Sequence, residues 1–356
     1  MQSRIVFRFA WVLFVPLLYG GWVRAQDTTP EDETIATIRQ LREISSADQR
    51  RIADWVQVQL DRLAAAPDAE RQAAAVGFRK TFKAQYENPA NSPPFKAQLA
   101  AQTAAVAAAQ FGDASLDHWV AYSLARVLVD MGGVETSAGL LAGLKSKHES
   151  ARFLCAEGLS AQKTAIAAEK GKLDETVQAL RGQGLVESSP IVLGRIYLAL
   201  AYTTQVPAVL DAYFAIFEKR LSARRGGAMM ADGAEVEAFE FFRTPSVLAA
   251  LNQAQKEQLA RSLAVFLRLD AERYNTTGLD FYEVDRLERT MDSEEAILAE
   301  LVGQGKGGKI RDELAAGGQD RRAEVLAEAY KWVGHPQSKE PGALNVAPWN
   351  VAVGAP

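Results

Sequence analysis

Apolar residues recur every three or four positions along almost the whole chain that follows the first 25 residues. In residues 50–64, for example, the apolar positions have the spacing of one helical face: Ile52, Trp55, Val56, Leu60 and Leu63. We find no run of alternating β-branched and polar residues bounded by turn signals, as a half-buried strand would require. The pattern therefore predicts an all-α protein whose helices each bury an apolar stripe.

Capping residues, prolines and glycines mark where these helices begin and end. Ser46-Ala47-Asp48-Gln49 has the form of a capping box, and Asn88-Pro89 ends a helix expected over residues 67–87. Eight of the thirteen residues 97–109 are alanine, so neighbouring backbones are expected to approach closely there. Further helices are expected over residues 234–243, 245–272, 280–302, 309–316 and 319–333.

Residues 115–221 contain a loose repeat of helix pairs. The first helices of the pairs are expected to begin near Ser115, Glu149 and Ser188, and their partners near Glu135, Leu173 and Val206. The helix over residues 190–203 is apolar on nearly all sides and carries Arg195 as its only charge. Such a helix is expected to lie inside a stack, with other helices on both sides.

This stretch resembles the HEAT and armadillo class of helical-pair solenoids. The resemblance is carried by residues 150–159, SARFLCAEGL, and by the helix over residues 190–202, and it covers about a third of the chain. The tetratricopeptide repeat has a similar period, but its Trp, Gly-Tyr and Pro pattern is missing here. The resemblance implies stacked antiparallel helix pairs, as an α-solenoid or an irregular helical array, with a concave surface and no catalytic residue.

The N-terminus has the features of a secretory signal peptide. Arg4 and Arg8 precede an apolar run from Phe9 to Tyr19, and Val23-Arg24-Ala25 provides a cleavage site before Gln26. The 15 uncharged residues between Arg8 and Arg24 fall short of the roughly 20 that a membrane-spanning helix needs. Without a twin-arginine start, we expect export by the general secretory route to the periplasm or the extracellular space, with no stable membrane insertion after cleavage.

These signals divide the chain into five parts: a signal peptide (1–25), N-terminal helices (26–90), a repeat-like region (91–225), C-terminal helices (226–333) and a tail or strap (334–356). The last part contains four prolines and no helical period. If it is a strap, Trp349 and Val351 are the residues expected to anchor it in an apolar pocket. If it is a disordered tail, they are not buried.

The charge of the chain limits the classes of partner it can bind, and its cysteine content limits its thiol chemistry. Removal of Arg4, Arg8 and Arg24 reduces the 40 basic residues to 37, which face 44 acidic ones, for a net charge of about −7. This mild acidity argues against nucleic acid and against an anionic membrane as partner. Cys155 is the only cysteine and lies on an apolar helical face, so we expect a buried, unreactive thiol.

Motifs for nucleotide and metal binding are incomplete. Residues 303–309, GQGKGGK, resemble a phosphate-binding loop but lack the preceding strand and the following hydroxyl residue. His118, His148 and His335 are far apart in the sequence, and one cysteine cannot build a thiolate site. Neither a metal nor a cofactor is therefore expected.

The acidic residues near position 280 allow two interpretations. Asp280, Glu283 and Asp285 could bind calcium, or they could form the solvated side of a helix. The sequence favours the second interpretation, because the same helix has its own apolar face: Phe281, Val284, Leu287 and Met291.

Two groups of residues are candidates for binding a partner. His118, Tyr122 and Arg126 have i, i+4, i+8 spacing, which places them on one side of a helix whose opposite stripe is apolar. Tyr and Arg contribute more than most residues to protein interfaces. Phe241 points away from the core face formed by Phe239 and Phe242, so it must meet another helix, a partner or the C-terminal strap.

Two functions from different classes remain open. The first is a non-enzymatic extracytoplasmic scaffold that binds a protein or peptide, which fits repeat-like helix pairs without a catalytic motif. The second is an all-α enzyme that acts on polysaccharide or peptidoglycan through two carboxylates. A deep acidic cleft containing a carboxyl with a perturbed pKa would favour the enzyme, and an open concave face would favour the scaffold.

Overall fold

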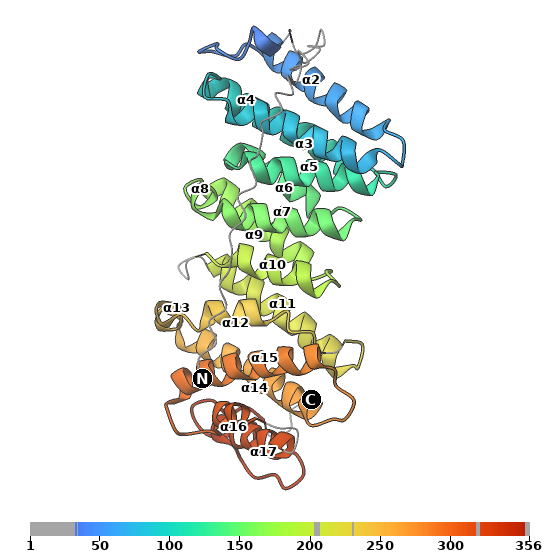
Figure 1. The fold of residues 1–356 in the computed structure, drawn as a ribbon. Coiled ribbons are helices and arrows are strands. Elements are labelled where there is room, and N and C mark those ends of the chain that lie inside the picture. Colours follow the sequence, from blue (N-terminus) through green and yellow to red (C-terminus); the bar gives the residue numbers. More distant parts are fainter. Residues whose placement is uncertain (1–32, 34, 203–206, 230, 318–320, 353–356) are drawn as a thin grey trace, which may run out of the picture.

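A computed structural model describes residue 33 and residues 35–202, 207–229, 231–317 and 321–352. In these ranges every regular element is a helix and none is a strand, which confirms the all-α prediction (Figure 1). No helix in this part of the chain combines the length and the apolar character needed to cross a membrane. The expected signal peptide and its cleavage site lie outside the described residues.

The helices of the first half are α2 (Ser46–Ala64), α3 (Arg71–Glu87), α4 (Pro93–Phe111), α5 (His118–Met131), α6 (Ser137–Gly143), α7 (Glu149–Ala161), α8 (Lys163–Ala167) and α9 (Lys170–Gly184). Those of the second half are α10 (Pro190–Leu200), α11 (Pro207–Arg225), α12 (Val236–Phe242), α13 (Pro245–Ala250), α14 (Gln253–Tyr274), α15 (Phe281–Val302), α16 (Ile310–Ala316) and α17 (Arg322–Val333). Two short 3-10 helices, η1 (Val134–Thr136) and η3 (Ala343–Asn345), complete the described elements.

The helices stack in two parallel rows along one long axis, from α2 at one end to α16 and α17 at the other (Figure 1). In one row α3, α5, α7, α10, α12 and α15 each contact the next helix. In the other row α2 contacts α4 and α4 contacts α6, and further along α9, α11, α14 and α17 make successive contacts. This arrangement confirms the prediction of stacked helix pairs. The helices expected within residues 115–221 are α5, α7 and α10 with their partners α6, α9 and α11.

Local capping chemistry explains where several of the helices begin. The Ser45 hydroxyl accepts a hydrogen bond from the Asp48 backbone, and the Asp48 carboxylate accepts one in return, one residue before the predicted capping box. The Asp117 and Ser189 side chains cap α5 and α10 by accepting hydrogen bonds from backbone N–H groups of the first turn, without the reciprocal bond. The expected starts near Ser115 and Ser188 therefore shift by two or three residues, to the position that follows each cap.

One expected helix, over residues 245–272, is two helices in the structure. The chain leaves helical geometry at Leu251, and Asn252 begins α14 with a reciprocal cap to Gln255. Asn competes with the helix for backbone hydrogen bonds and is therefore favoured at such a cap. The apolar period continued across this break and concealed it.

The C-terminal segment packs against α17 as a strap over its described residues. Leu344 is fully buried, and both predicted anchors, Trp349 and Val351, are 8% exposed. The Val351 N–H donates to the Leu344 carbonyl at 2.9 Å, which closes a loop around η3. Between the strap and a disordered tail, the structure supports the strap for residues 334–352.

Candidate functional site

The predicted stripe lies along α5, with one exposed and two half-buried members. His118 is exposed, whereas Tyr122 and Arg126 are half-buried, and the Tyr122 ring packs against the core. The Arg126 guanidinium pairs with Asp130 on its own helix at 2.9 Å, and Asp130 also lies 3.6 Å from Arg79 of α3. The Arg126 charge is thus already engaged within the fold.

Stacking brings a second histidine to this stripe. The rings of His118 and His148 lie 5.4 Å apart, because His148 precedes α7 and α7 packs beside α5. The His148 Nε2 donates to the Leu116 carbonyl at 2.8 Å, which fixes the orientation of the ring. The two histidines are therefore neighbours in space, although they are 30 positions apart in the sequence.

Four rings form a continuous row at this position. The centroid of the His118 ring lies 5.7 Å from that of Trp119, and Trp119 lies 6.3 Å from Tyr122. His148 extends the row onto the next layer of the stack. Within the described part of the chain, no group of three or more His, Cys, Asp or Glu side chains could hold a metal ion.

Phe241 meets another helix, which resolves the three alternatives for its environment. Its ring stacks on Tyr213 of α11 at 5.0 Å with an interplanar angle of 8°. The Tyr213 hydroxyl in turn donates to the Tyr197 carbonyl of α10 at 2.7 Å. Phe241 is half-buried, and its stacking on Tyr213 joins α12 to α11.

An exposed aromatic pair occurs where the sequence predicted a core residue. Phe281 is 78% exposed and Tyr282 71% exposed, and their ring centroids lie 5.8 Å apart. The assignment of Phe281 to the apolar face of its helix is therefore wrong, whereas Leu287 and Met291 on that face are buried. Asp280 and Glu283 form the reciprocal cap of α15, so both act in helix initiation.

A hollow of about 360 Å³ lies beside Phe281. It is lined by Tyr274, Leu279, Asp280, Phe281, Val284, Glu288 and Arg322. The Arg322 guanidinium lies over the Tyr274 ring at 5.3 Å and donates to the Thr276 carbonyl. The Tyr274 hydroxyl donates to Glu288 at 2.6 Å. Phe281 of the aromatic pair thus borders a hollow with an apolar wall and an arginine already held in place.

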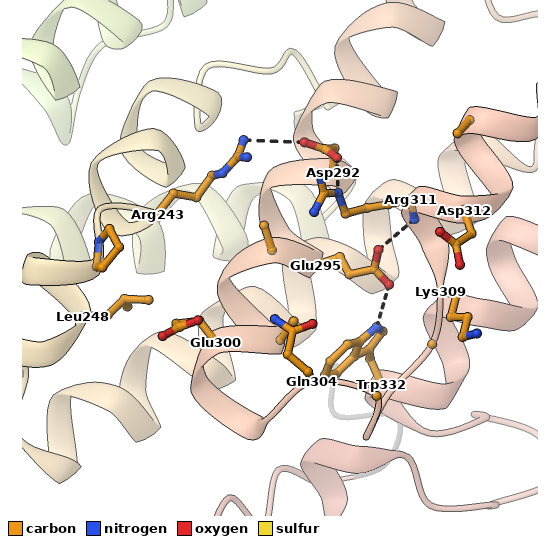
Figure 2. Close-up of a pocket in the computed structure, with 16 residues that line it drawn as sticks. Arg243, Leu248, Asp292, Glu295, Glu300, Gln304, Lys309, Arg311, Asp312 and Trp332 are labelled. Carbon is orange, nitrogen blue, oxygen red and sulfur yellow. Dashed lines mark hydrogen bonds and ion pairs between the residues drawn. The ribbon is translucent and has the colours of Figure 1, made fainter.

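A larger cleft, of about 750 Å³, opens between α13, α15, α16 and α17 (Figure 2). Asp292 lies on one side of it and bridges Arg243 at 3.5 Å and Arg311 at 2.5 Å. Exposed Glu300 and Asp312 carboxylates also line the cleft. Acidic and basic groups thus alternate along its wall.

Glu295 is the most deeply buried carboxyl of the cleft. Burial raises its pKa, although the carboxylate accepts from the Ile310 N–H at 2.8 Å, the Arg311 N–H at 2.7 Å and the Trp332 Nε1 at 3.3 Å. Figure 2 shows Glu295 between Arg311 and Trp332. Both of its oxygens are therefore used to start α16 and to fix Trp332.

The glycine-rich residues 303–309 connect α15 to α16 and so follow a helix. Gly307 packs against the Trp332 ring and Gly308 against the Glu328 carbonyl, where a side chain on either glycine would collide. These glycines are needed for the close approach of the turn to α17. Their packing accounts for the motif without a phosphate.

Sequence reasoning missed the exposed pair, although a signal was present. Adjacent residues on a helix differ by about 100° in direction, so Phe281 and Tyr282 cannot both face one apolar stripe.

The chain matches no protein-family model, and neither a curated protein nor a solved structure shows significant similarity to it.

Proposed function

We propose that this protein is a non-enzymatic extracytoplasmic scaffold that binds a protein or peptide partner. The observation that carries the proposal is the exposed Phe281–Tyr282 pair at the edge of the hollow near α15. Large exposed aromatic side chains beside a hollow are typical of interaction sites, because folding alone gives no reason to leave them in water.

Charge favours a protein over a lipid surface or a nucleic acid as the partner. The pair is flanked by Asp280, Glu283 and Asp285, and the whole chain has a net charge of −4. An anionic bilayer or a phosphate backbone would be repelled at this position. A peptide that places an apolar side chain against the two rings meets no such repulsion.

The two-row stack supports the proposed kinship with HEAT- and armadillo-like solenoids. In such a stack the apolar stripes are buried between layers, and specificity comes from side chains on the exposed ridges. The row formed by His148, His118, Trp119 and Tyr122 is a second ridge of this kind, on the opposite half of the molecule. Export by the secretory route remains part of the proposal.

The alternative is a carboxylate-pair enzyme acting on polysaccharide or peptidoglycan, with the larger cleft as its site. In its favour, Glu295 has a raised pKa and lines a cleft of suitable size. Against it, Asp292 is held by two arginines and Glu295 by three N–H donors. These bonds leave neither carboxyl free to transfer a proton, so the geometry supports the scaffold better.

Site-specific photo-crosslinking tests the proposal. A photoreactive phenylalanine analogue replaces Tyr282, and the same analogue replaces Ile191 in a matched control. Both positions are the second residue of their helix, and Ile191 is 64% exposed. In the exported fraction we expect position 282 to yield a discrete protein adduct that Phe281→Ser diminishes. Equal adducts at both positions, or an adduct with lipid or glycan alone, would contradict the proposal.

A further inference from the structure

A cluster of six charged groups lies inside the C-terminal half of the stack. Arg220 of α11 donates to Glu235 and to Asp232, each at 2.5 Å, and Arg224 of the same helix pairs with Asp270 of α14. Glu294 of α15 lies within hydrogen-bonding reach of Asp270. The cluster therefore joins α11, the start of α12, α14 and α15.

The charges of this cluster do not balance if every group is ionised. Arg220, Arg224, Glu235, Asp270 and Glu294 are all at least nine-tenths buried. Three buried carboxylates then face two guanidinium groups, and Asp232 at the rim adds a further negative charge. A buried charge without a partner is costly, so the cluster is expected to bind a proton.

Hydrogen bonding shows where that proton belongs. Asp270 Oδ2 and both Glu294 carboxyl oxygens are buried and receive no hydrogen bond from any described residue. One proton on Glu294, donated to Asp270 Oδ2, satisfies two of these three atoms at once. With this proton bound, two buried guanidinium groups face two buried carboxylates, so the buried charges balance.

The surroundings of Glu294 agree with this assignment. It faces Asp270 from α14, Arg224 from α11 and Glu235 from the start of α12, and the cluster continues to Arg220, Asp232 and Tyr197. Burial, with Asp270 second, raises the pKa of Glu294 well above its usual range. Burial alone would also raise the pKa of Glu235, but Arg220 and Arg224 outweigh it and lower that pKa. Glu294 is therefore the group that stays protonated.

We propose that the proton shared by Asp270 and Glu294 is a pH-sensitive lock that holds α15 against α14 and α11. When the proton is lost, a third buried carboxylate is left without a counter-charge or a donor. Hydration of the cluster then lowers its free energy. Water can enter only if α15 separates from its neighbours. The same helix carries the Phe281–Tyr282 pair and the cleft residues Asp292 and Glu295, so the lock controls the surfaces at this end of the stack.

The direction of the pH effect follows from linkage. Because the folded protein binds the Glu294 proton more tightly than the unfolded chain, the stabilisation is complete below the usual carboxyl pKa of 4.5. It is lost as the pH rises through the folded pKa. Between the unfolded and the folded pKa, the equilibrium constant for opening increases by up to about tenfold per pH unit, and above the folded pKa it no longer changes.

Hydrogen exchange followed by mass spectrometry tests the lock in the full chain. Opening constants, corrected for the intrinsic pH dependence of exchange, are compared between pH 5 and pH 9 for α14 and α15, with α4 as internal reference. We expect the constants for α14 and α15 to rise by at least about tenfold relative to α4. Glu294→Gln, which keeps a donor for Asp270 but cannot ionise, should remove this rise, whereas Glu300→Gln on the exposed side of α15 should retain it.

Asp270→Asn provides a second neutral variant in case Glu294→Gln does not fold. It also leaves one fewer ionisable carboxyl in the cluster, so a pH-independent α15 in this variant supports the proposal. A wild-type α15 that opens no more than α4 between pH 5 and pH 9 overturns it. So does a rise that persists unchanged in either folded variant.

Discussion

Gly139 of α6 lies directly against Ala104 of α4: a Cβ atom built on Gly139 would come 2.9 Å from the Ala104 Cα. The same atom would come 2.8 Å from a methyl group of Leu128 in α5. The alanine-rich segment therefore does allow its backbone to approach a neighbour closely, as its composition predicts. Here the close approach joins two successive layers of the stack.

Gly139→Ala should consequently destabilise the protein, because the added methyl group has no space between α4 and α5. We expect a loss of about 1–3 kcal/mol in the free energy of unfolding, measured by urea denaturation. Gly77→Ala is the matched control, since Gly77 is exposed within α3 and nothing lies within 4 Å of its Cβ position. It should add about 0.5–1 kcal/mol of stability through helix propensity. Equal effects at the two glycines would refute the packing argument.

Cys155 should behave as an inert thiol in the folded protein. It is fully buried against Gly143, and burial raises its pKa far above that of a free cysteine. Because only the thiolate reacts, a thiol reagent at pH 8 should label the native chain very slowly. One equivalent should react at once after denaturation in guanidinium chloride. Rapid labelling of the native protein would mean that α7 opens readily.

Local chemistry made several helix starts predictable, although the break at Leu251 was missed. Glu149 begins α7 at the expected residue, and the caps at Asp117 and Ser189 lie within three residues of the predicted starts. Such caps act on backbone groups two or three positions away, so a single sequence contains their whole signal. The apolar period likewise placed Cys155 in the core.

Contacts between layers left no comparable signal. His118 and His148 are separated by 30 positions, and Arg224 and Asp270 by 46, yet each pair is in contact. The helical period shows which face of a helix is apolar, but not which helix covers that face. Phe281 continues the apolar period of its helix, yet it is 78% exposed.

The ion pair between Arg152 and Glu187 should contribute to stability in a pH-dependent manner. Glu187, with 1% of its side chain exposed, accepts from Arg152 at 2.8 and 2.9 Å, and from Gln183 and the Ser189 N–H. Arg152→Ala removes two donors from a buried carboxylate and should cost about 2–4 kcal/mol at pH 7 by urea unfolding. Arg261→Ala, which breaks an exposed pair with Glu257, should cost no more than about 0.5 kcal/mol.

Acid should diminish the difference between the wild type and Arg152→Ala. Burial would raise the pKa of Glu187, but its hydrogen bonds from Arg152, Ser189 and Gln183 outweigh burial and lower it. A lowered folded pKa gives stability that is present above the usual carboxyl pKa and lost as the pH falls through the folded value. Unfolding measured at pH 7 and at pH 3 checks this. A difference that grows on acidification would contradict it.

Glu295 should matter for the fold around the cleft, and its neighbour Glu300 should not. Glu295→Ala leaves the Ile310 and Arg311 N–H groups and the Trp332 Nε1 without their acceptor. We expect a loss of about 1–2 kcal/mol, comparable to the loss of a strong helix cap. Glu300→Ala removes an exposed carboxylate from the same cleft and should leave the free energy of unfolding nearly unchanged. If Glu295→Ala leaves the free energy of unfolding unchanged, this carboxyl is not needed for the fold, and that result would strengthen the enzyme alternative.

The stripe formed by His118, Tyr122 and Arg126 requires separate tests of binding and of folding. Tyr122 is half-buried against the core, so Tyr122→Ala should cost about 1–3 kcal/mol in stability whether or not the stripe binds a partner. His118 is exposed, and His118→Ala should change the free energy of unfolding by less than about 0.5 kcal/mol.

The binding test uses a photoreactive residue in place of Arg126. If the row formed by His148, His118, Trp119 and Tyr122 binds a partner, this residue should form a protein adduct in the exported fraction, and His118→Ala should weaken that adduct. An adduct indifferent to His118→Ala would exclude this histidine from the interface, and no adduct at all would limit the binding surface to the Phe281–Tyr282 end of the stack.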